Sequence, residues 1–282
     1  STGSSLNAPN LFLSKLKSAK SVVIMKPSWG WKKHYDLQII PKHDTPSFFH
    51  LKRSNAVITL GAPTSIRKED LKEKASKLST LLKLPWISDP RVSDPRGSDP
   101  SQKYISIFIG GNFSHHHLTV SAIHQLVQKL NKVTQEKDLN LLITTSRRTP
   151  NDVSQYLKNT FSNHPRCPLL TIAAETLSQP EDLISGMMGL AELILVTEDS
   201  ISMISEAASS GKNTIVIQTD LDQKEKKSKH RQFIQELAQE KYIDLAPLPV
   251  LDKIMAQKLE STIPYKVLNN TIPIQDTLLK LL

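Results

Sequence analysis

The chain has 282 residues, which is enough for two domains, because one hydrophobic core rarely serves more than about 250 to 300 residues. With 38% hydrophobic and 22% charged residues it reads as a globular protein, and it has no apolar run near the roughly 18 residues of a membrane span. A single cysteine, Cys167, excludes an intrachain disulfide and fits a reducing compartment, and the formal net charge is +9.

The first part of the chain predicts alternating strands and helices. A Gly/Ser turn at 1–5 leads into a helix, an unusual start for a domain, so we expect the first domain to be incomplete. A charged amphipathic stretch from Arg67 to Lys83 predicts a second helix. Between the two helices lie three short apolar runs that predict strands: Ser21–Met25, Asp36–Ile40 and Asn55–Gly61.

A Pro-rich stretch separates the two parts of the chain. It repeats Ser-Asp-Pro three times between Ser88 and Pro100, and this turn chemistry continues neither a helix nor a central strand. We therefore place a linker at 88–102, after an amino-terminal Rossmann-like domain at 1–87.

Beyond the linker, apolar runs alternate regularly with helical patterns. Runs that are apolar on both faces and joined by helices predict a parallel sheet covered on both sides. We expect an α/β protein with two Rossmann-like domains, the second at 103–270, and a terminal helix at 271–282 that packs on either domain. The predicted strands are 104–111, 140–146, 169–174, 192–199 and 213–218, and the predicted helices are 120–136, 152–161, 181–188 and 200–209.

Residues that follow the predicted strands are the candidates for a binding site, since ligands of open parallel sheets bind beyond the carboxyl ends of the strands. Gly110 and Gly111 allow backbone N–H groups to approach a phosphate, or they form only a tight turn. Ser146 and Arg147 follow the next strand. The guanidinium of Arg147 is expected either to clamp a diphosphate or carboxylate, or only to cap the next helix.

A third candidate lies at the start of the predicted helix 200–209. Ser200 or its neighbour Asp199 caps this helix, and Ser202 and Glu206 lie four residues apart on one face. This spacing suits a phosphate beside the serines and sugar hydroxyls at the glutamate. The alternative is a solvated glutamate on an ordinary helix.

The basic run KEKKSKHR at 224–231 is typical of a solvated loop or helix entry. No aromatic residues alternate with it, so we expect no nucleic-acid partner. We also expect no metal, because no Asp-x-Asp motif stands at a strand end and the three adjacent histidines at 115–117 make a poor set of ligands.

Several motifs together resemble a known family, the plant mitochondrial fission factor called the elongated-mitochondria protein and its bacterial relatives. The motifs are YDLQIIPKHD at 35–44, VITLGAPTSI at 57–66, IGGNFSHH at 109–116, TTSRRTP at 144–150 and VTEDSISMISEAASSGK at 196–212. Family members resemble glycosyltransferases of the two-domain GT-B type. The resemblance implies that Gly110 and Gly111 approach a diphosphate, that Ser200 and Ser202 lie beside it, and that Glu206 holds the ribose.

In the amino-terminal domain the resemblance directs attention to His43 and Asp44 of the PKHD motif. His43 is the candidate general base for an acceptor hydroxyl, against the alternative of a hydrogen-bonded structural histidine. The implied function is a nucleotide-sugar-dependent transferase, with Arg147 stabilising the departing diphosphate and no further cofactor. A nucleotide-sugar epimerase of the same architecture is a close alternative.

Two other function classes stay open at this point. One is a non-catalytic adaptor that recruits a partner such as a dynamin-related GTPase, and the other is a Rossmann-like module for a different phosphate ligand. TTSRRTP looks more like bacterial members of the family, which favours a cytoplasmic protein; peripheral contact with a membrane stays open. The sequence names neither the donor nucleotide, the sugar nor the acceptor.

Overall fold

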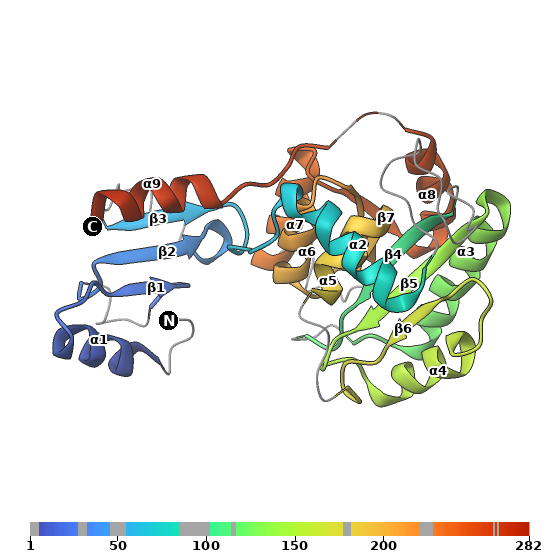
Figure 1. The fold of residues 1–282 in the computed structure, drawn as a ribbon, viewed down its shortest axis with the longest axis horizontal. Helices are drawn as coiled ribbons and strands as arrows, with labels where there is room; N and C mark the ends of the chain where they lie inside the picture. The colour runs from blue at the N-terminus through green and yellow to red at the C-terminus, as the bar shows by residue number, and fades with distance from the viewer. Residues whose placement is uncertain are drawn as a thin grey trace. The chain divides into compact units, whose positions relative to one another are not determined.

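The computed structural model describes residues 6–27, 33–45, 55–84, 102–113, 117–176, 182–219, 228–261, 263 and 265–281. The Ser-Asp-Pro linker predicted at 88–102 lies outside the described residues except for Gln102, and so do His115, His116 and the turn at 1–5. The chain divides into two compact units (Figure 1). One comprises Ser1–Thr64, Lys229–Phe233 and Asn269–Leu282, and the other comprises Ser65–Ser228 and Ile234–Leu268.

The first unit contains a parallel sheet in the order β1 (Val22–Ile24), β2 (Leu37–Pro41), β3 (Ala56–Thr59). Helix α1 (Asn7–Leu16) packs on one face through Leu11, and α9 (Thr271–Leu281) packs on the other face (Figure 1). The terminal helix, predicted to pack on either domain, therefore completes the first unit. A short 3-10 helix, η2 (Lys42–Asp44), follows β2. A second one, η3 (Lys68–Asp70), precedes α2 and belongs to the second unit.

The second unit contains a parallel sheet in the order β6-β5-β4-β7-β8-β9. Counted along the chain this is the order 3-2-1-4-5-6 of a doubly wound Rossmann fold, so the predicted α/β class is confirmed. The strands are β4 (Lys103–Ile109), β5 (Leu139–Thr145), β6 (Leu169–Thr171), β7 (Ala191–Thr197), β8 (Asn213–Gln218) and β9 (Asp244–Pro247). Strands β4, β5 and β7 are buried over almost their whole length, as expected for a sheet covered on both faces.

Helices cover both faces of this second sheet (Figure 1). One face packs against α3 (Val120–Lys137), α4 (Asn151–Phe161) and α8 (Leu251–Glu260), which together form the largest hydrophobic core. The remaining helices are α2 (Leu71–Leu82), α5 (Leu183–Leu190), α6 (Ile201–Ser209) and α7 (Lys229–Gln239). Helix α7 begins in the first unit and continues in the second. The elements α7, β9 and α8 were not predicted from the sequence.

Helix α2 belongs to the second unit, whereas the predicted boundary placed it in the first domain. The reason is its packing against α5. A Cβ atom added to Gly189 would lie 2.3 Å from the carbonyl oxygen of Leu71, and one added to Gly186 would lie 2.8 Å from Cβ of Leu78. The two glycines thus let the helices approach closely, and this contact is formed between residues on opposite sides of the linker in sequence.

The structure contains no helix, within its described ranges, that is long and apolar enough to cross a membrane.

An ion-pair cluster around a buried carboxylate ties α3 to α8. Asp252 is 5% exposed, and its carboxylate lies 2.7 Å from Nζ of Lys132 and 3.0 Å from Nζ of Lys129. The hydrogen bond from Lys132 is the main cause that lowers the pKa of Asp252 to about 2, and Lys129 adds to it while burial opposes it. The ionised carboxylate therefore stabilises the folded state.

We expect Asp252→Asn to lower the stability of the protein at neutral pH. The folded-state pKa lies below the ordinary value of 3.8, so the stabilisation is complete above that value and disappears as the pH falls from 3.8 to about 2. Urea unfolding at several pH values measures this difference. Asp138→Asn is the control, because the side chain of Asp138 is 86% exposed and its pair with Arg166 contributes little. A difference between wild type and Asp252→Asn that is constant with pH would contradict the assignment.

Candidate functional site

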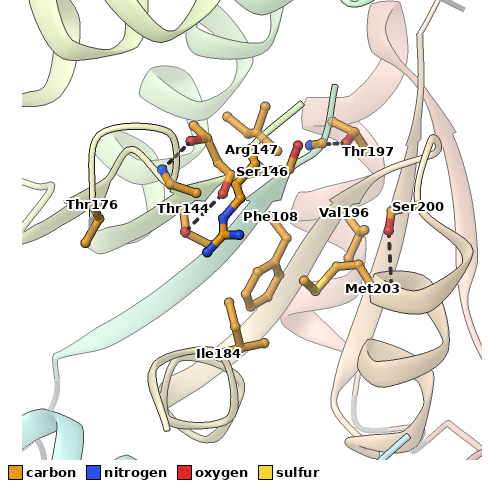
Figure 2. Close-up of a pocket in the computed structure, with 14 residues that line it drawn as sticks. Phe108, Thr144, Ser146, Arg147, Thr176, Ile184, Val196, Thr197, Ser200 and Met203 are labelled. Atoms are coloured by element: carbon orange, nitrogen blue, oxygen red, sulfur yellow. Dashed lines mark hydrogen bonds between the residues drawn. The ribbon is translucent and has the colours of Figure 1, made fainter. Parts of the chain in front are cut away.

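A pocket of about 300 Å³ opens at the carboxyl ends of β4, β5 and β7 (Figure 2). Between β4 and β7 the strand order reverses, and this switch point is where open α/β sheets bind their ligands. The pocket therefore lies where the sequence placed the candidate site. Its walls are formed by Phe108, Ile109, Gly110, Thr144, Thr145, Ser146, Arg147, Ala173, Thr176, Ile184, Val196, Thr197, Ser200 and Met203.

The glycine pair after β4 is fixed by internal hydrogen bonds. The N–H of Gly110 donates to Oγ1 of Thr197 at 2.7 Å, and the N–H of Gly111 donates to Oδ2 of Asp199 at 2.9 Å. Both N–H groups are thus bonded to the end of β7 and the loop that follows it. The predicted approach of both groups to one phosphate oxygen would require Asp199 to move. Gly110 lines the pocket, and Gly111 is absent from its walls.

Close packing explains why these positions hold glycine. A Cβ atom on Gly110 would lie 1.9 Å from Oδ1 of Asp199, and one on Gly111 would lie 2.1 Å from the carbonyl oxygen of Arg148. Any side chain at either position would displace backbone or a buried carboxylate. The glycines therefore allow the loops after β4, β5 and β7 to meet.

Asp199 is the buried charge around which these loops are arranged. Its side chain is 1% exposed and accepts hydrogen bonds from Gly111, from Oγ1 of Thr197 at 2.6 Å and from Arg148 at 3.3 Å. These bonds compensate for the loss of water around the carboxylate. Asp199 had been predicted only as an alternative helix cap, so its role as the centre of the network was missed.

Arg147 and Arg148 are neighbours with different surroundings. Both are exposed, but Arg148 donates a hydrogen bond to Asp199, whereas Arg147 lines the pocket. Among the described residues, none accepts a hydrogen bond from the Arg147 guanidinium. Figure 2 shows this side chain extending from the end of β5 into the pocket. A guanidinium in this setting is suited to a bidentate contact with a phosphate or carboxylate.

Helix α6 begins at the pocket, as predicted. Ser200 is its N-cap: its hydroxyl accepts from the N–H of Met203 at 3.4 Å, and both residues line the pocket. Ser202 is exposed and lies outside the pocket walls. The predicted pair of serines is therefore separated, and only Ser200 faces the pocket.

Glu206 also lies outside the pocket walls, but it follows Met203 by three residues and so occupies the next turn on the same side of α6. Its side chain is half-buried, and in the described part of the chain no group donates a hydrogen bond to its carboxylate. Burial raises the pKa of Glu206. A carboxylate that is desolvated and unsatisfied is a good acceptor for ligand hydroxyl groups.

The apolar wall of the pocket was not predicted from the sequence. Phe108 on β4, Ile184 on α5 and Met203 on α6 gather on one side of it, opposite the hydroxyl groups at the end of β5 (Figure 2). A pocket with an apolar wall and a few polar groups is typical of a small-molecule site. Helices α5 and α6 lie beside each other only because both pack on the sheet. The spacing of residues in the sequence therefore does not predict this apolar wall.

The amino-terminal candidates, His43 and Asp44, lie on η2 in the first unit. Nε2 of His43 is 4.0 Å from Oδ2 of Asp44, and its ring centroid is 5.2 Å from that of Phe233. Burial is the largest cause that lowers the pKa of His43; nearby His230 and Lys229 lower it further, and Asp44 opposes them. His43 is therefore neutral near pH 7, the form that a general base requires.

Comparison with known proteins identifies the family. The sequence profile of the family described as Mitochondrial fission ELM1 matches residues 1–282, the whole chain. The chain belongs to the Mitochondrial fission ELM1 family. An uncharacterised protein of Rickettsia prowazekii (strain Madrid E), RP120, is 29% identical over 140 residues, which cover 50% of this chain and 38% of that protein. The chain thus matches well under half of the length of this relative.

Solved structures place this ELM1-family chain in the GT-B-like fold. The UDP-GlcNAc 2-epimerase of Methanocaldococcus jannaschii aligns with a TM-score of 0.59 over 99% of this chain and 75% of its own, at 12% identity. The UDP-GlcNAc 2-epimerase of Neisseria meningitidis, bound to UDP-GlcNAc, aligns with a TM-score of 0.52 over 96% of this chain and 72% of its own, at 15% identity. At these identities the likeness establishes the fold, and the chemistry of the family member must be argued from its own residues.

Within the described residues, no group of three or more His, Cys, Asp or Glu side chains is placed to hold a metal ion. The predicted absence of metal remains a prediction.

The packing of Gly110 against Asp199 can be tested with a double-mutant cycle. Gly110→Ala alone forces the new methyl group against the buried carboxylate, and Asp199→Ala alone leaves Gly111 and Thr197 without their acceptor. We expect each to lower the free energy of unfolding by about 2 to 4 kcal/mol. The double variant should lose at least about 1 kcal/mol less than the sum, because the second change removes the clash. Additive losses in urea unfolding would show that the two residues do not share this contact.

Proposed function

We propose that the pocket at the end of β4, β5 and β7 binds the nucleotide diphosphate part of a nucleotide sugar, and that this chain is a nucleotide-sugar-dependent transferase of the GT-B type. The observation that carries the proposal is the Arg147 guanidinium at a pocket in the switch point of a doubly wound sheet. Two proteins with the same fold are UDP-GlcNAc 2-epimerases, one of them bound to UDP-GlcNAc, and this supports the choice of ligand class.

Arg147 is assigned to the diphosphate. The bond that breaks in sugar transfer leaves negative charge on the diphosphate, and a positioned guanidinium stabilises that charge in the transition state. Ser146 and Ser200 supply hydroxyl groups at the same pocket, and the amino end of α6 adds the favourable end of its helix dipole. Charge stabilisation by the protein itself is the reason for proposing a reaction with no added cofactor.

Glu206 is assigned to the ribose. It lies one turn beyond Met203, and its half-buried carboxylate has no donor among the described residues. Two adjacent hydroxyl groups of a ribose would satisfy the two carboxylate oxygens. Ser202 is on the exposed side of α6, so any role in binding requires a ligand that extends beyond the pocket walls.

His43 is assigned to proton transfer from the acceptor. Its lowered pKa keeps the imidazole neutral, and in the described residues its buried Nδ1 atom has no hydrogen-bond partner. Asp44 is 4.0 Å away and favours the protonated form once a proton is taken. The acceptor itself, and a cytoplasmic location, stay proposals from the sequence.

An epimerase is the second candidate, since both aligned structures named above are UDP-GlcNAc 2-epimerases. The two reactions share a bound nucleotide sugar but differ in product. Incubation with UDP-GlcNAc followed by chromatography and NMR separates them. Release of UDP with the GlcNAc passed to water and unchanged at C2 supports the transferase, and a sugar epimeric at C2 supports the epimerase. Binding without either product favours the adaptor.

Calorimetry against UDP, GDP, ADP and CMP and their sugar conjugates tests the site directly. We expect one class to bind saturably and to raise the melting temperature. Arg147→Ala should weaken this binding by roughly 10- to 100-fold, because a charge-assisted contact contributes about 1.5 to 3 kcal/mol. Arg166→Ala is the matched control, since Arg166 pairs with Asp138 away from the pocket. Equal affinity of wild type and Arg147→Ala, or no binding by the folded protein, would contradict the proposal.

The pH dependence of binding tests Glu206. The carboxylate accepts two ribose hydroxyl groups only when ionised, and its pKa is raised by burial. Affinity should therefore decrease as the pH falls through this raised pKa, above the ordinary value of 4.5. A sugar conjugate is the suitable ligand because its diphosphate diester keeps a fixed charge there. Glu206→Gln should abolish this dependence, whereas Glu192→Gln, an exposed change on β7, should preserve it.

A further inference from the structure

The excess of positive over negative charge is confined to one of the two units. The first unit contains 12 Lys and Arg but only three Asp and Glu, a net charge of +9, which equals that of the whole chain. The second unit contains 24 residues of each sign and is neutral. The unit with the proposed nucleotide pocket thus carries no excess charge, so the basic character serves some other partner of the first unit.

Helix α1 in this basic unit is oriented against the usual pattern of a surface helix. Its face toward the sheet is polar: Asn7 accepts from the hydroxyl of Tyr35 at 2.8 Å, and Asn10 donates to the carbonyl oxygen of Val22 at 3.2 Å. Only Leu11 adds a buried apolar side chain from this helix. A helix that only covers a sheet would place its apolar residues inward.

The outward face of α1 is apolar instead. Leu6, Phe12, Leu13 and Leu16 are exposed by 45, 67, 54 and 63%. At 100° per residue, Phe12, Leu13 and Leu16 lie on the side opposite Leu11. We call these four residues, with Lys15, Lys17 and Lys20 beside them, the α1 patch. Figure 1 shows α1 as the outer layer of this unit, on the face of the sheet away from α9.

The lysines complete the amphipathic character of the patch. Lys15, Lys17 and Lys20 are all exposed, and Lys15 and Lys17 lie at the two edges of the apolar face. Among the described residues neither of these two forms an ion pair, and Lys20 lies 3.8 Å from Asp36. Long lysine side chains at the edges of an apolar face keep their charge in water or at phosphate groups while the apolar face is buried.

We infer that the α1 patch docks the protein on an anionic membrane surface, with Phe12, Leu13 and Leu16 entering the headgroup region and the lysines contacting lipid phosphates. Apolar side chains flanked by lysines are what an interfacial helix requires, and the charge of the whole unit adds long-range attraction. A second copy of the chain is disfavoured as the occupant because two units of charge +9 repel each other. This inference is independent of the proposed nucleotide site.

Vesicle flotation tests the inference with the full chain. We expect binding to vesicles of phosphatidylcholine containing phosphatidylglycerol, weaker binding at high salt, and little binding to phosphatidylcholine alone. Lys15→Gln with Lys17→Gln should weaken binding by about tenfold or more, since each lysine near an anionic surface contributes roughly fivefold. Leu13→Asn with Leu16→Asn should weaken it to a similar extent, because the apolar insertion is lost.

Leu279→Asn is the matched control, since Leu279 is 74% exposed on α9, which covers the opposite face of the same sheet. It should bind vesicles as the wild type does. Circular dichroism and thermal unfolding show whether the α1 variants are folded, and we expect them to be, because the substituted side chains are exposed. Absence of vesicle binding, equal binding to neutral and anionic vesicles, or equal binding by wild type and α1 variants would overturn the inference. So would a dimer in sedimentation that the leucine variant dissociates.

Discussion

The loops that form the pocket depend on one buried carboxylate. Asp199 follows β7, and it receives hydrogen bonds from the loop after β4 through Gly111 and from the loop after β5 through Arg148. A buried carboxylate is stable only when such donors replace its water, so the three loops cannot separate without exposing or stranding the charge. The positions of Ser146, Arg147 and Ser200 follow from this constraint, because each directly adjoins one of the linked segments.

This constraint changes the interpretation of why Gly110 and Gly111 follow β4. Their N–H groups were expected to serve a phosphate, yet in the structure they serve Thr197 and Asp199. The Asp199 carboxylate thus accepts the hydrogen bond from Gly111 that an anionic ligand would otherwise accept. A ligand that accepted a hydrogen bond from Gly111 would have to displace Asp199, and Arg148 would then lie near two competing anions. Binding through Arg147 and the hydroxyl groups needs no such rearrangement.

The sequence predicted the sheet and the position of Gly110, Arg147 and Ser200 at its carboxyl edge, because both depend on local patterns. That these residues bind a ligand stays a prediction. Strands such as β4 and β7 are continuous apolar runs, and the residues after them must lie at the carboxyl edge of a parallel sheet. The boundary between the two units was harder to predict from the sequence. Helix α2 precedes the linker but packs on α5 through Gly186 and Gly189, a contact between residues more than 100 positions apart that leaves no periodic signal.

The same limit explains why the placement of some candidate residues relative to the pocket could not be predicted. Ser202 and Glu206 share a helix face by spacing, but which way that face turns is set by burial of Ile204, Ala207 and Ala208 against the sheet. Short-range spacing cannot fix this rotation for a helix of nine residues. Asp199 likewise looked like a cap, since a carboxylate before a helix usually is one. Two of its partners, Gly111 and Arg148, follow two other strands, and only the assembled sheet brings them within hydrogen-bonding distance.

The two units differ in net charge, and this difference suits them to different kinds of partner. The second unit has no net charge and so no long-range field of its own, and under the proposed function only local cations such as Arg147 would attract an anion. The first unit has the opposite design, with charge +9 spread over it and an apolar helix face turned to solvent. Diffuse charge with exposed leucines suits an extended surface such as a bilayer, whereas a single guanidinium in a pocket suits one small ligand.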